Sequence, residues 1–269
     1  MTRDRSVSAK LRYINAEWRN SAEPPRIGSR ESRRANTAEH EVLVQDARAA
    51  TGEFGLELSG FALRAHPATD VGATNAEARA SYREAMLELV RQESGATRTV
   101  LFADLVRTED TTDFNTAYSR FVHCDYNLAS TRRMSHDLLR HRGLQPDDAA
   151  SYAWYNTWQP FDHDATQNPL AVLDVRSLDA SDIIPYRYSG YSGEDGEGGL
   201  VSAPVFNPLH RWYFYPDMTP SEVLLTKQLD LRPGHTQQCP HTSFLDDTRA
   251  ADTPPRRSIE TRILAIFER

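Results

Sequence analysis

The sequence predicts a mainly β protein with flanking α-helices, in which the strands build a β-sandwich or a jelly roll. Two observations support this fold class. The clearest helical pattern lies in the first half of the chain, and short segments rich in β-branched and aromatic residues dominate the second half. The sequence contains neither an internal repeat nor a glycine-rich dinucleotide- or phosphate-binding motif.

The first half predicts one long helix between short strands. Apolar residues recur on one helical face over residues 75–93, and Gly95 follows where such a helix would end. Residues 97–105, TRTVLFADL, predict a buried strand. Residues 41–48 and 60–66 predict two further short strands.

The second half predicts mostly strands. One helix with a basic face is expected over residues 131–141. The predicted strands cover residues 118–123, 152–158, 170–175, 211–215, 222–231 and 258–267. Residues 177–200 contain YSGYSGEDGEGG and predict a long surface loop, which is a candidate lid if it lies near an active site.

The polar start of the chain predicts the domain organisation. We expect residues 1–40, rich in Arg, Ser and Glu, to be a partly flexible N-terminal extension, with loop or disorder over residues 24–38. Residues 41–269 are then expected to form a single jelly-roll domain with a helical N-terminal part, which is long enough to bury a core.

Charge and cysteine content exclude several functional classes. The net charge of −7 argues against binding to nucleic acid or to an anionic membrane surface, and the longest apolar runs are too short to cross a bilayer. The start of the chain lacks the apolar segment of a secretory signal. Two cysteines cannot form a disulfide framework, so we expect a cytoplasmic protein. The sequence leaves the oligomeric state open, with a homodimer as one option.

The sharpest chemical feature is the pair His123 and Asp125. Side chains at positions i and i+2 of a strand share a face, so these two would point the same way. An imidazole nitrogen and a carboxylate oxygen are two of the three ligands in the facial triad that binds non-haem iron(II). The structural alternative for such a short motif is a surface pair or a buried histidine with a hydrogen-bond partner.

A facial triad needs a distant histidine as its third ligand. His241, in CPHTSF, is the best candidate, because strand candidates separate it from Asp125. His210, in PLHRWYFYP, is the main rival, although it opens an aromatic strand and could instead be a core histidine. His163 and His235 lie in segments that predict a loop and a turn.

The last predicted strand begins with a candidate carboxylate site. Arg256 and Ser258 would share a face, and a guanidinium can bind a carboxylate through two hydrogen bonds to which a hydroxyl adds a third. This arrangement suits the distal carboxylate of 2-oxoglutarate. The alternative is a solvated, basic entry to the strand.

Several ordered stretches between roughly residues 40 and 267 carry a family resemblance. They are GFALRAH, YREAMLELVRQESGATRTVLFADLVR, VHCDYN, YNTWQP with PLAVLD, HRWYFYPDMTPSEVLLTKQLD, PHTSF and PRRSIETR. Through them the chain resembles fungal and bacterial hydroxylase/desaturases, among them gibberellin desaturase-like and cephalosporin 7-alpha-methoxylase-like proteins.

The resemblance implies a double-stranded β-helix (jelly-roll) oxygenase core. It implies iron(II) bound by His123, Asp125 and a distal histidine, which we place at His241. It also implies 2-oxoglutarate as cosubstrate and O2 as oxidant, with Arg256 as anchor of the far carboxylate and Arg262 as the alternative anchor.

Three further residues match the family's pattern. Lys227 would support the pocket, and Asn156 and Trp158 would line the site. For the last two the structural alternatives are a turn or backbone cap and core packing.

The implied reaction is hydroxylation or desaturation of a small organic molecule, typically in secondary metabolism. The alternatives are a 2-oxoglutarate-independent iron enzyme on a similar barrel, such as a dioxygenase or isomerase, and a metal-free binding protein. The sequence does not define the substrate.

Overall fold

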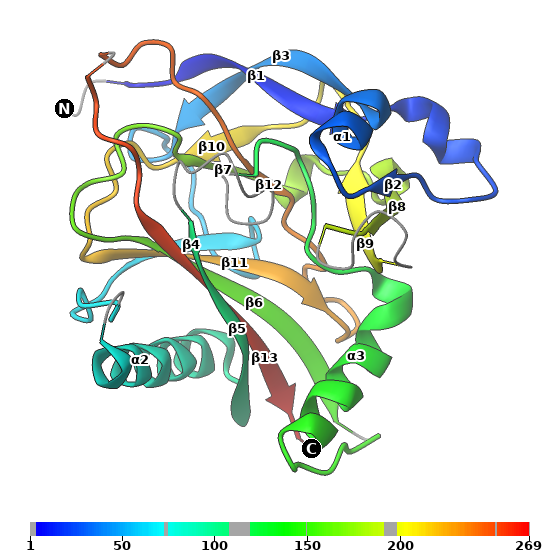
Figure 1. Ribbon diagram of the computed structural model, residues 1–269, viewed down its shortest axis with the longest axis vertical. Coiled ribbons are helices and arrows are strands. Elements are labelled where there is room, and N and C mark those ends of the chain that lie inside the picture. Colours follow the sequence, from blue (N-terminus) through cyan, green and yellow to red (C-terminus); the bar gives the residue numbers. More distant parts are fainter. Residues whose placement is uncertain are drawn as a thin grey trace.

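The computed structural model describes residues 4–72, 75–107, 119–148, 150–190, 198–250 and 252–268. Two five-stranded sheets face each other, and a small three-stranded sheet lies beside them (Figure 1). The predicted class, mainly β with flanking helices and a jelly-roll core, is therefore confirmed.

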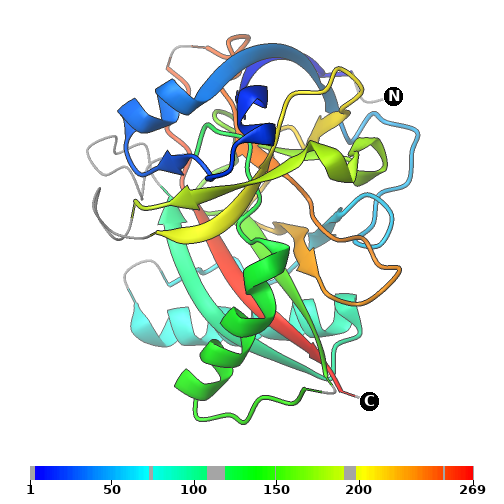
Figure 2. The same ribbon diagram turned by 90° about the vertical axis from the view of Figure 1, so that its right-hand side faces the viewer.

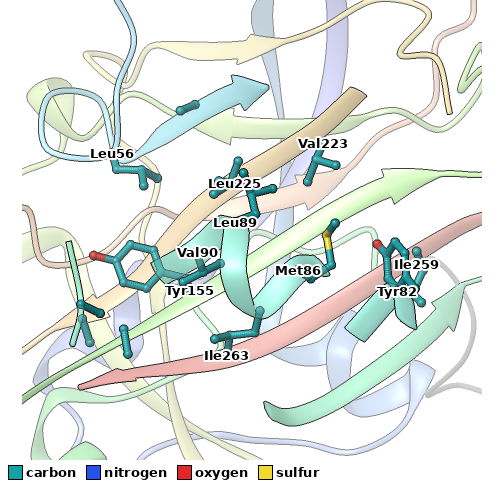
Figure 3. Packing of buried hydrophobic residues seen from close by; sticks show 14 of the residues in the cluster. Leu56, Tyr82, Met86, Leu89, Val90, Tyr155, Val223, Leu225, Ile259 and Ile263 are labelled. Carbon is teal, nitrogen blue, oxygen red and sulfur yellow. The ribbon is translucent and has the colours of Figure 1, made fainter. Parts of the chain in front are cut away.

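The first of the five-stranded sheets, here called the central sheet, is antiparallel throughout. Its strands in spatial order are β4 (Phe61–Ala65), β11 (Glu222–Asp230), β6 (Ser151–Pro160), β13 (Ser258–Phe267) and β5 (Arg98–Arg107). Helix α2 (Ala76–Ser94) covers one face of this sheet. Its buried Tyr82, Met86 and Leu89 pack against the sheet in one apolar cluster (Figure 3).

The second five-stranded sheet, here called the upper sheet, contains one parallel pair, β3 with β10. Its strands in spatial order are β1 (Val7–Ile14), β3 (Thr37–Asp46), β10 (Trp212–Phe214), β7 (Leu170–Leu173) and β12 (His241–Ser243). Trp212 and Phe214 are fully buried in the apolar cluster of this sheet.

The small sheet lies on the same side of the molecule as helix α3 (Leu128–His141), as Figure 2 shows. Its strands are β2 (Arg26–Ile27), β8 (Ile183–Tyr188) and β9 (Gly199–Pro204). The remaining helical segments are η1 (Ala16–Asn20), α1 (Arg30–Asn36), η2 (Val175–Ser177) and η3 (Ala180–Asp182). Within the part of the chain that the structure describes, every helix is too short or too polar to cross a membrane.

Helix α2 begins and ends where its capping residues predict. The side chain of Asn75 accepts hydrogen bonds from the backbone N–H groups of Glu77 and Ala78, which have no partner inside the helix. Gly95 adopts the left-handed conformation with φ 69°, which closes the last turn without a Cβ clash. The helix predicted over residues 75–93 is confirmed.

The expected N-terminal extension is wrong for most of its length. Strand β1 alternates buried and exposed residues, and Leu11 and Tyr13 are almost completely buried in the upper sheet. Residues 24–38 include α1, which begins with a capping box at Ser29. Strand β3 begins at Thr37 and so crosses the expected boundary at residue 40. The polar composition concealed a strand with one apolar face.

Other elements differ in detail from their predictions. Strand β5 is an edge strand and none of its residues is fully buried, because only β13 pairs with it. The loop predicted over residues 177–200 contains β8, and residues 191–197 of the candidate lid lie outside the described residues. Tyr118, where a strand was predicted to begin, also lies outside them, and only isolated bridges form at His123 and Cys124.

The burial of β1 makes a testable prediction. Leu11→Ala should lower the free energy of unfolding by about 2–5 kcal/mol, because it removes a buried side chain and leaves a cavity. The matched control is Lys10→Ala on the exposed face of the same strand, for which we expect a change within about 0.5 kcal/mol. Urea unfolding measures both. Equally small effects would mean that β1 does not belong to the folded core.

Candidate metal centre

The segment that carries His123 and Asp125 is held between two sheets. On one side, the backbone N–H of His123 donates to the carbonyl of His241 at 3.1 Å, and the reverse bond is 3.0 Å long. On the other side, the N–H of Cys124 donates to the carbonyl of Ser202 in β9 at 2.7 Å. These bridges bring His123 beside His241, although 117 positions separate them, and their ring centroids lie 4.5 Å apart.

Three side chains converge there with the donor set of a facial triad. One ligand atom from each of His123, Asp125 and His241 lies within 4.8 Å of the other two. The side chains of His123 and Asp125 are only 12% and 5% exposed, and His241 is buried. Two imidazoles and one carboxylate in this arrangement suit a divalent transition metal such as iron(II).

The hydrogen bonds of His123 leave one nitrogen for a metal. Its Nδ1 lies 2.6 Å from the carbonyl oxygen of Phe121 and would donate to it, so the unprotonated Nε2 faces Asp125 at 3.6 Å. Burial, together with the neighbouring His241, lowers the pKa of His123 to about 4. The ring is therefore neutral near pH 7 and its lone pair is available.

Asp125 is held by both of its carboxylate oxygens. Asn156 Nδ2 donates to Oδ2 at 2.5 Å, and Arg262 Nη2 donates to Oδ1 at 3.1 Å. Burial alone would raise the pKa of Asp125, but Arg262 and the two histidines outweigh it and hold this pKa below its ordinary value. Asp125 is thus ionised and restrained.

A small cavity adjoins the two histidines. Arg256 and Trp158 form part of its wall, and the Arg256 guanidinium lies 5.2 Å from the Trp158 ring centre. Arg256 is 2% exposed and contacts the carbonyl of Asn168 and, at 3.2 Å, the hydroxyl of Ser243. The other residues around the cavity are Arg107, Ser119, Leu170 and Glu260.

Ser258, the predicted carboxylate-binding hydroxyl, is not among the residues that line this cavity. It is fully buried at the start of β13, two residues after Arg256. Among the described residues, none provides a hydrogen-bond partner for its Oγ. A buried hydroxyl without a partner is unfavourable, so a bound acceptor would stabilise it.

Not every predicted site residue lies at the centre. His210, the rival third ligand, is a buried core histidine whose Nε2 lies 3.2 Å from Asp182 and whose Nδ1 lies 3.3 Å from the Tyr13 hydroxyl. The guanidinium of Arg262, the alternative cosubstrate anchor, contacts Asp125 and Glu260, and Arg262 is not itself among the residues around the cavity.

Lys227 belongs to a separate charged cluster. It follows Thr226 and precedes Gln228 on β11, and its ammonium lies 2.5 Å from Glu57 and 3.0 Å from Asp230. The expected support of the pocket by Lys227 is therefore wrong, since strand alternation directs it to the other face. Glu57, Asp230 and His235 also converge within 4.8 Å, but Lys227 and Arg232 already neutralise these carboxylates.

Sequence reasoning missed two residues of the site. Glu260 lies on β13 between Ser258 and Arg262, and the shared parity of these positions could have identified it. Gln228 accepts a long hydrogen bond from the backbone of Asp125 at 3.4 Å, and its amide nitrogen lies 3.3 Å from Nδ1 of His241. No signal in the sequence indicates these contacts of Gln228 with Asp125 and His241.

Comparisons with known proteins agree on the family. A family model described as an oxidoreductase/YMDC permease-like domain matches residues 11–266. The chain is 30% identical to the hydroxylase/desaturase efuI of Hormonema carpetanum, over 98% of this chain and 96% of that protein. It is 26% identical to the Fe(II)/2-oxoglutarate-dependent dioxygenase nvfI of Aspergillus novofumigatus, over 85% and 84%.

A solved structure shares the fold. The iron and alpha-ketoglutarate-dependent endoperoxidase NvfI superposes with a TM-score of 0.83 at 22% identity, and the match covers the whole of both chains. The family model and the near full-length match to efuI show the family. The chain belongs to the hydroxylase/desaturase family of oxidoreductases.

Proposed function

We propose that this enzyme is an iron(II)- and 2-oxoglutarate-dependent oxygenase that hydroxylates or desaturates a small organic molecule. The observation that carries the proposal is the convergence of His123, Asp125 and His241 within 4.8 Å, in a protein whose relatives are named hydroxylase/desaturase and Fe(II)/2-oxoglutarate-dependent dioxygenase. The family resemblance carried by stretches such as VHCDYN and PHTSF further implies that the substrate is a secondary metabolite.

The three side chains fit iron(II) in number and type. His123 and His241 would supply imidazole nitrogens, and Asp125 would supply one carboxylate oxygen. With only three protein ligands, a bound metal would keep positions for the cosubstrate and O2. When bound, iron(II) and 2-oxoglutarate supply the power to activate O2 and oxidise a C–H bond.

Arg256 and Ser258 are the residues that we assign to the far carboxylate of 2-oxoglutarate. Arg256 lines the cavity that adjoins both histidines, and the buried Ser258 hydroxyl lies on the same strand entry. A guanidinium and a hydroxyl in a buried site bind a carboxylate strongly, because water cannot compete for it. Trp158 supports the guanidinium with its ring.

We further propose a cytoplasmic location. Cys124 and Cys239 are both buried free thiols, as expected for a protein that folds in a reducing compartment. Fractionation of the producing cells tests this location, and sedimentation of the purified protein distinguishes a monomer from the homodimer considered above.

The iron site can be tested directly in solution. Anaerobic addition of iron(II) and 2-oxoglutarate to the purified protein should produce the weak visible charge-transfer band of the metal–cosubstrate chelate. His123→Ala and His241→Ala should abolish the band, because each removes a ligand. His210→Gln is the matched control and should keep it, since His210 contacts Tyr13 and Asp182.

Each other outcome of this titration would support a different function or a different set of metal ligands. Iron binding without a band would favour the 2-oxoglutarate-independent enzyme. Absence of iron binding would favour the metal-free binding protein. A band that survives His241→Ala and disappears in His210→Gln would move the third ligand to His210.

The cosubstrate anchor makes a separate prediction. Arg256→Ala should raise the Kd for 2-oxoglutarate by roughly 100-fold, and Ser258→Ala by roughly 10-fold, in line with about 1.5–3 kcal/mol for a hydrogen bond to a charged group. Calorimetric titration of the metal-loaded protein measures both constants. The exposed neighbour Arg257, which pairs with Asp162, provides the control Arg257→Ala, whose Kd should stay unchanged. An unchanged Kd in Arg256→Ala would exclude this anchor.

A further inference from the structure

Arg262 bridges two buried carboxylates beside the triad. Its Nη2 donates to Asp125 Oδ1 at 3.1 Å, and its Nε donates to Glu260 Oε1 at 2.6 Å. Arg262 is 14% exposed, Glu260 11% and Asp125 5%. The second oxygen of Glu260 lies 3.7 Å from Arg107 on the neighbouring strand β5. Hydrogen bonds to Asp125 and to Glu260 thus hold the Arg262 guanidinium in place.

The other carboxylate oxygen of Asp125, Oδ2, accepts a hydrogen bond from the neighbouring strand β6. Asn156 on β6 is the register partner of Arg262 on β13, and its amide donates to Asp125 Oδ2 at 2.5 Å. Asn156 and Arg262, which are neighbours in the central sheet, therefore each donate a hydrogen bond to a different oxygen of the Asp125 carboxylate. A carboxylate has about four acceptor sites, so each oxygen keeps one for a further partner.

The backbone bonds of His123 and Cys124 hold the chain next to Asp125, but they leave the direction of its carboxylate to other contacts. Regular strand pairing is absent from the segment described around it, which forms isolated bridges at His123 and Cys124 only. The backbone N–H of Asp125 makes only a long bond, 3.4 Å, to Gln228. The orientation of the carboxylate therefore depends on its side-chain contacts, as is usual for groups behind metal ligands.

We propose that Arg262 is a positioning residue for Asp125 and that, together with Asn156, it presets this carboxylate for the metal. The proposal rests on the function proposed above and assigns separate tasks to two arginines. Arg256 faces the cavity and would bind the cosubstrate, whereas the guanidinium of Arg262 is committed to Asp125 and Glu260.

Electrostatics and positioning predict opposite effects on metal affinity. Removing a positive charge beside the site would by itself strengthen the binding of a divalent cation. Removing the hydrogen bond that orients Asp125 would weaken it, and substitutions behind metal ligands typically cost about 10–100-fold in affinity. A weakened affinity in a variant without this charge therefore reports lost positioning.

The test is an anaerobic titration with cobalt(II), followed by its visible absorption bands, on the whole protein. Arg262→Gln should weaken cobalt(II) binding about 10–100-fold and alter the bands, because the Asp125 ligand is displaced. Arg262→Lys keeps the charge and one donor, so it should recover part of the affinity. The Kd for 2-oxoglutarate, measured at saturating metal, should change less than about threefold, whereas Arg256→Ala should show the reverse pattern.

Two variants guard against a loss of folding. Arg262→Gln leaves Glu260 without its closest cation, so the double variant Arg262→Gln/Glu260→Gln removes both charges and leaves no unpaired carboxylate at position 260. It should weaken cobalt(II) binding as the single variant does. Asn156→Ala removes the other hydrogen bond to the Asp125 carboxylate and should also weaken cobalt(II) binding.

Three results would overturn the proposal. Unchanged or tighter cobalt(II) binding in both Arg262→Gln and the double variant would show that positioning is unimportant. A tenfold weaker 2-oxoglutarate affinity with unchanged metal affinity would make Arg262 a cosubstrate anchor. If the unsubstituted protein binds no cobalt(II), the proposed function itself fails, and the role of Arg262 fails with it.

Discussion

The site depends on one short stretch of backbone pairing. The reciprocal hydrogen bonds between His123 and His241 attach the segment around Cys124 to β12, and the bond from Cys124 to Ser202 attaches it to β9. These contacts place two distant imidazoles side by side and direct Asp125 toward the central sheet. The two sheets thus provide the rigid frame, and the segment between them provides two of the three candidate ligands.

Charge balance explains why such a polar site can be buried. Asp125 and Glu260 are largely buried carboxylates, and without Arg262 between them they would repel each other and favour protonation. Burial alone raises the pKa of Glu260, but Arg262 outweighs it and holds this pKa below its ordinary value. Arg256 remains on the cavity side with Trp158. One guanidinium lies toward the triad and the other toward the cavity, and under the proposed function this separation would divide metal positioning from cosubstrate binding.

Periodicity predicted the parts of the fold in which local pattern and burial agree. Helix α2 and strand β13 occur where predicted, because one continuous apolar face marks each of them. Strand β1 was missed, since charged residues on its outer face dominate the composition. The shared direction of His123 and Asp125 was expected from strand alternation, and His241 was preferred to His210 on the sequence alone. The fold adds the direct backbone pairing of His123 with His241 and the contact of His210 with Asp182. Lys227 was misplaced because its facing direction depends on the pairing of β11.

The central claim is that a metal lies between His123, Asp125 and His241. Crystals grown anaerobically with iron(II) and 2-oxoglutarate, measured on both sides of the iron absorption edge, locate the metal without reference to activity. The account predicts one strong anomalous peak, about 2 Å from a nitrogen of each histidine and from an Asp125 oxygen. A peak at Glu57, Asp230 and His235 instead, or no peak in crystals that contain the loaded protein, would contradict it.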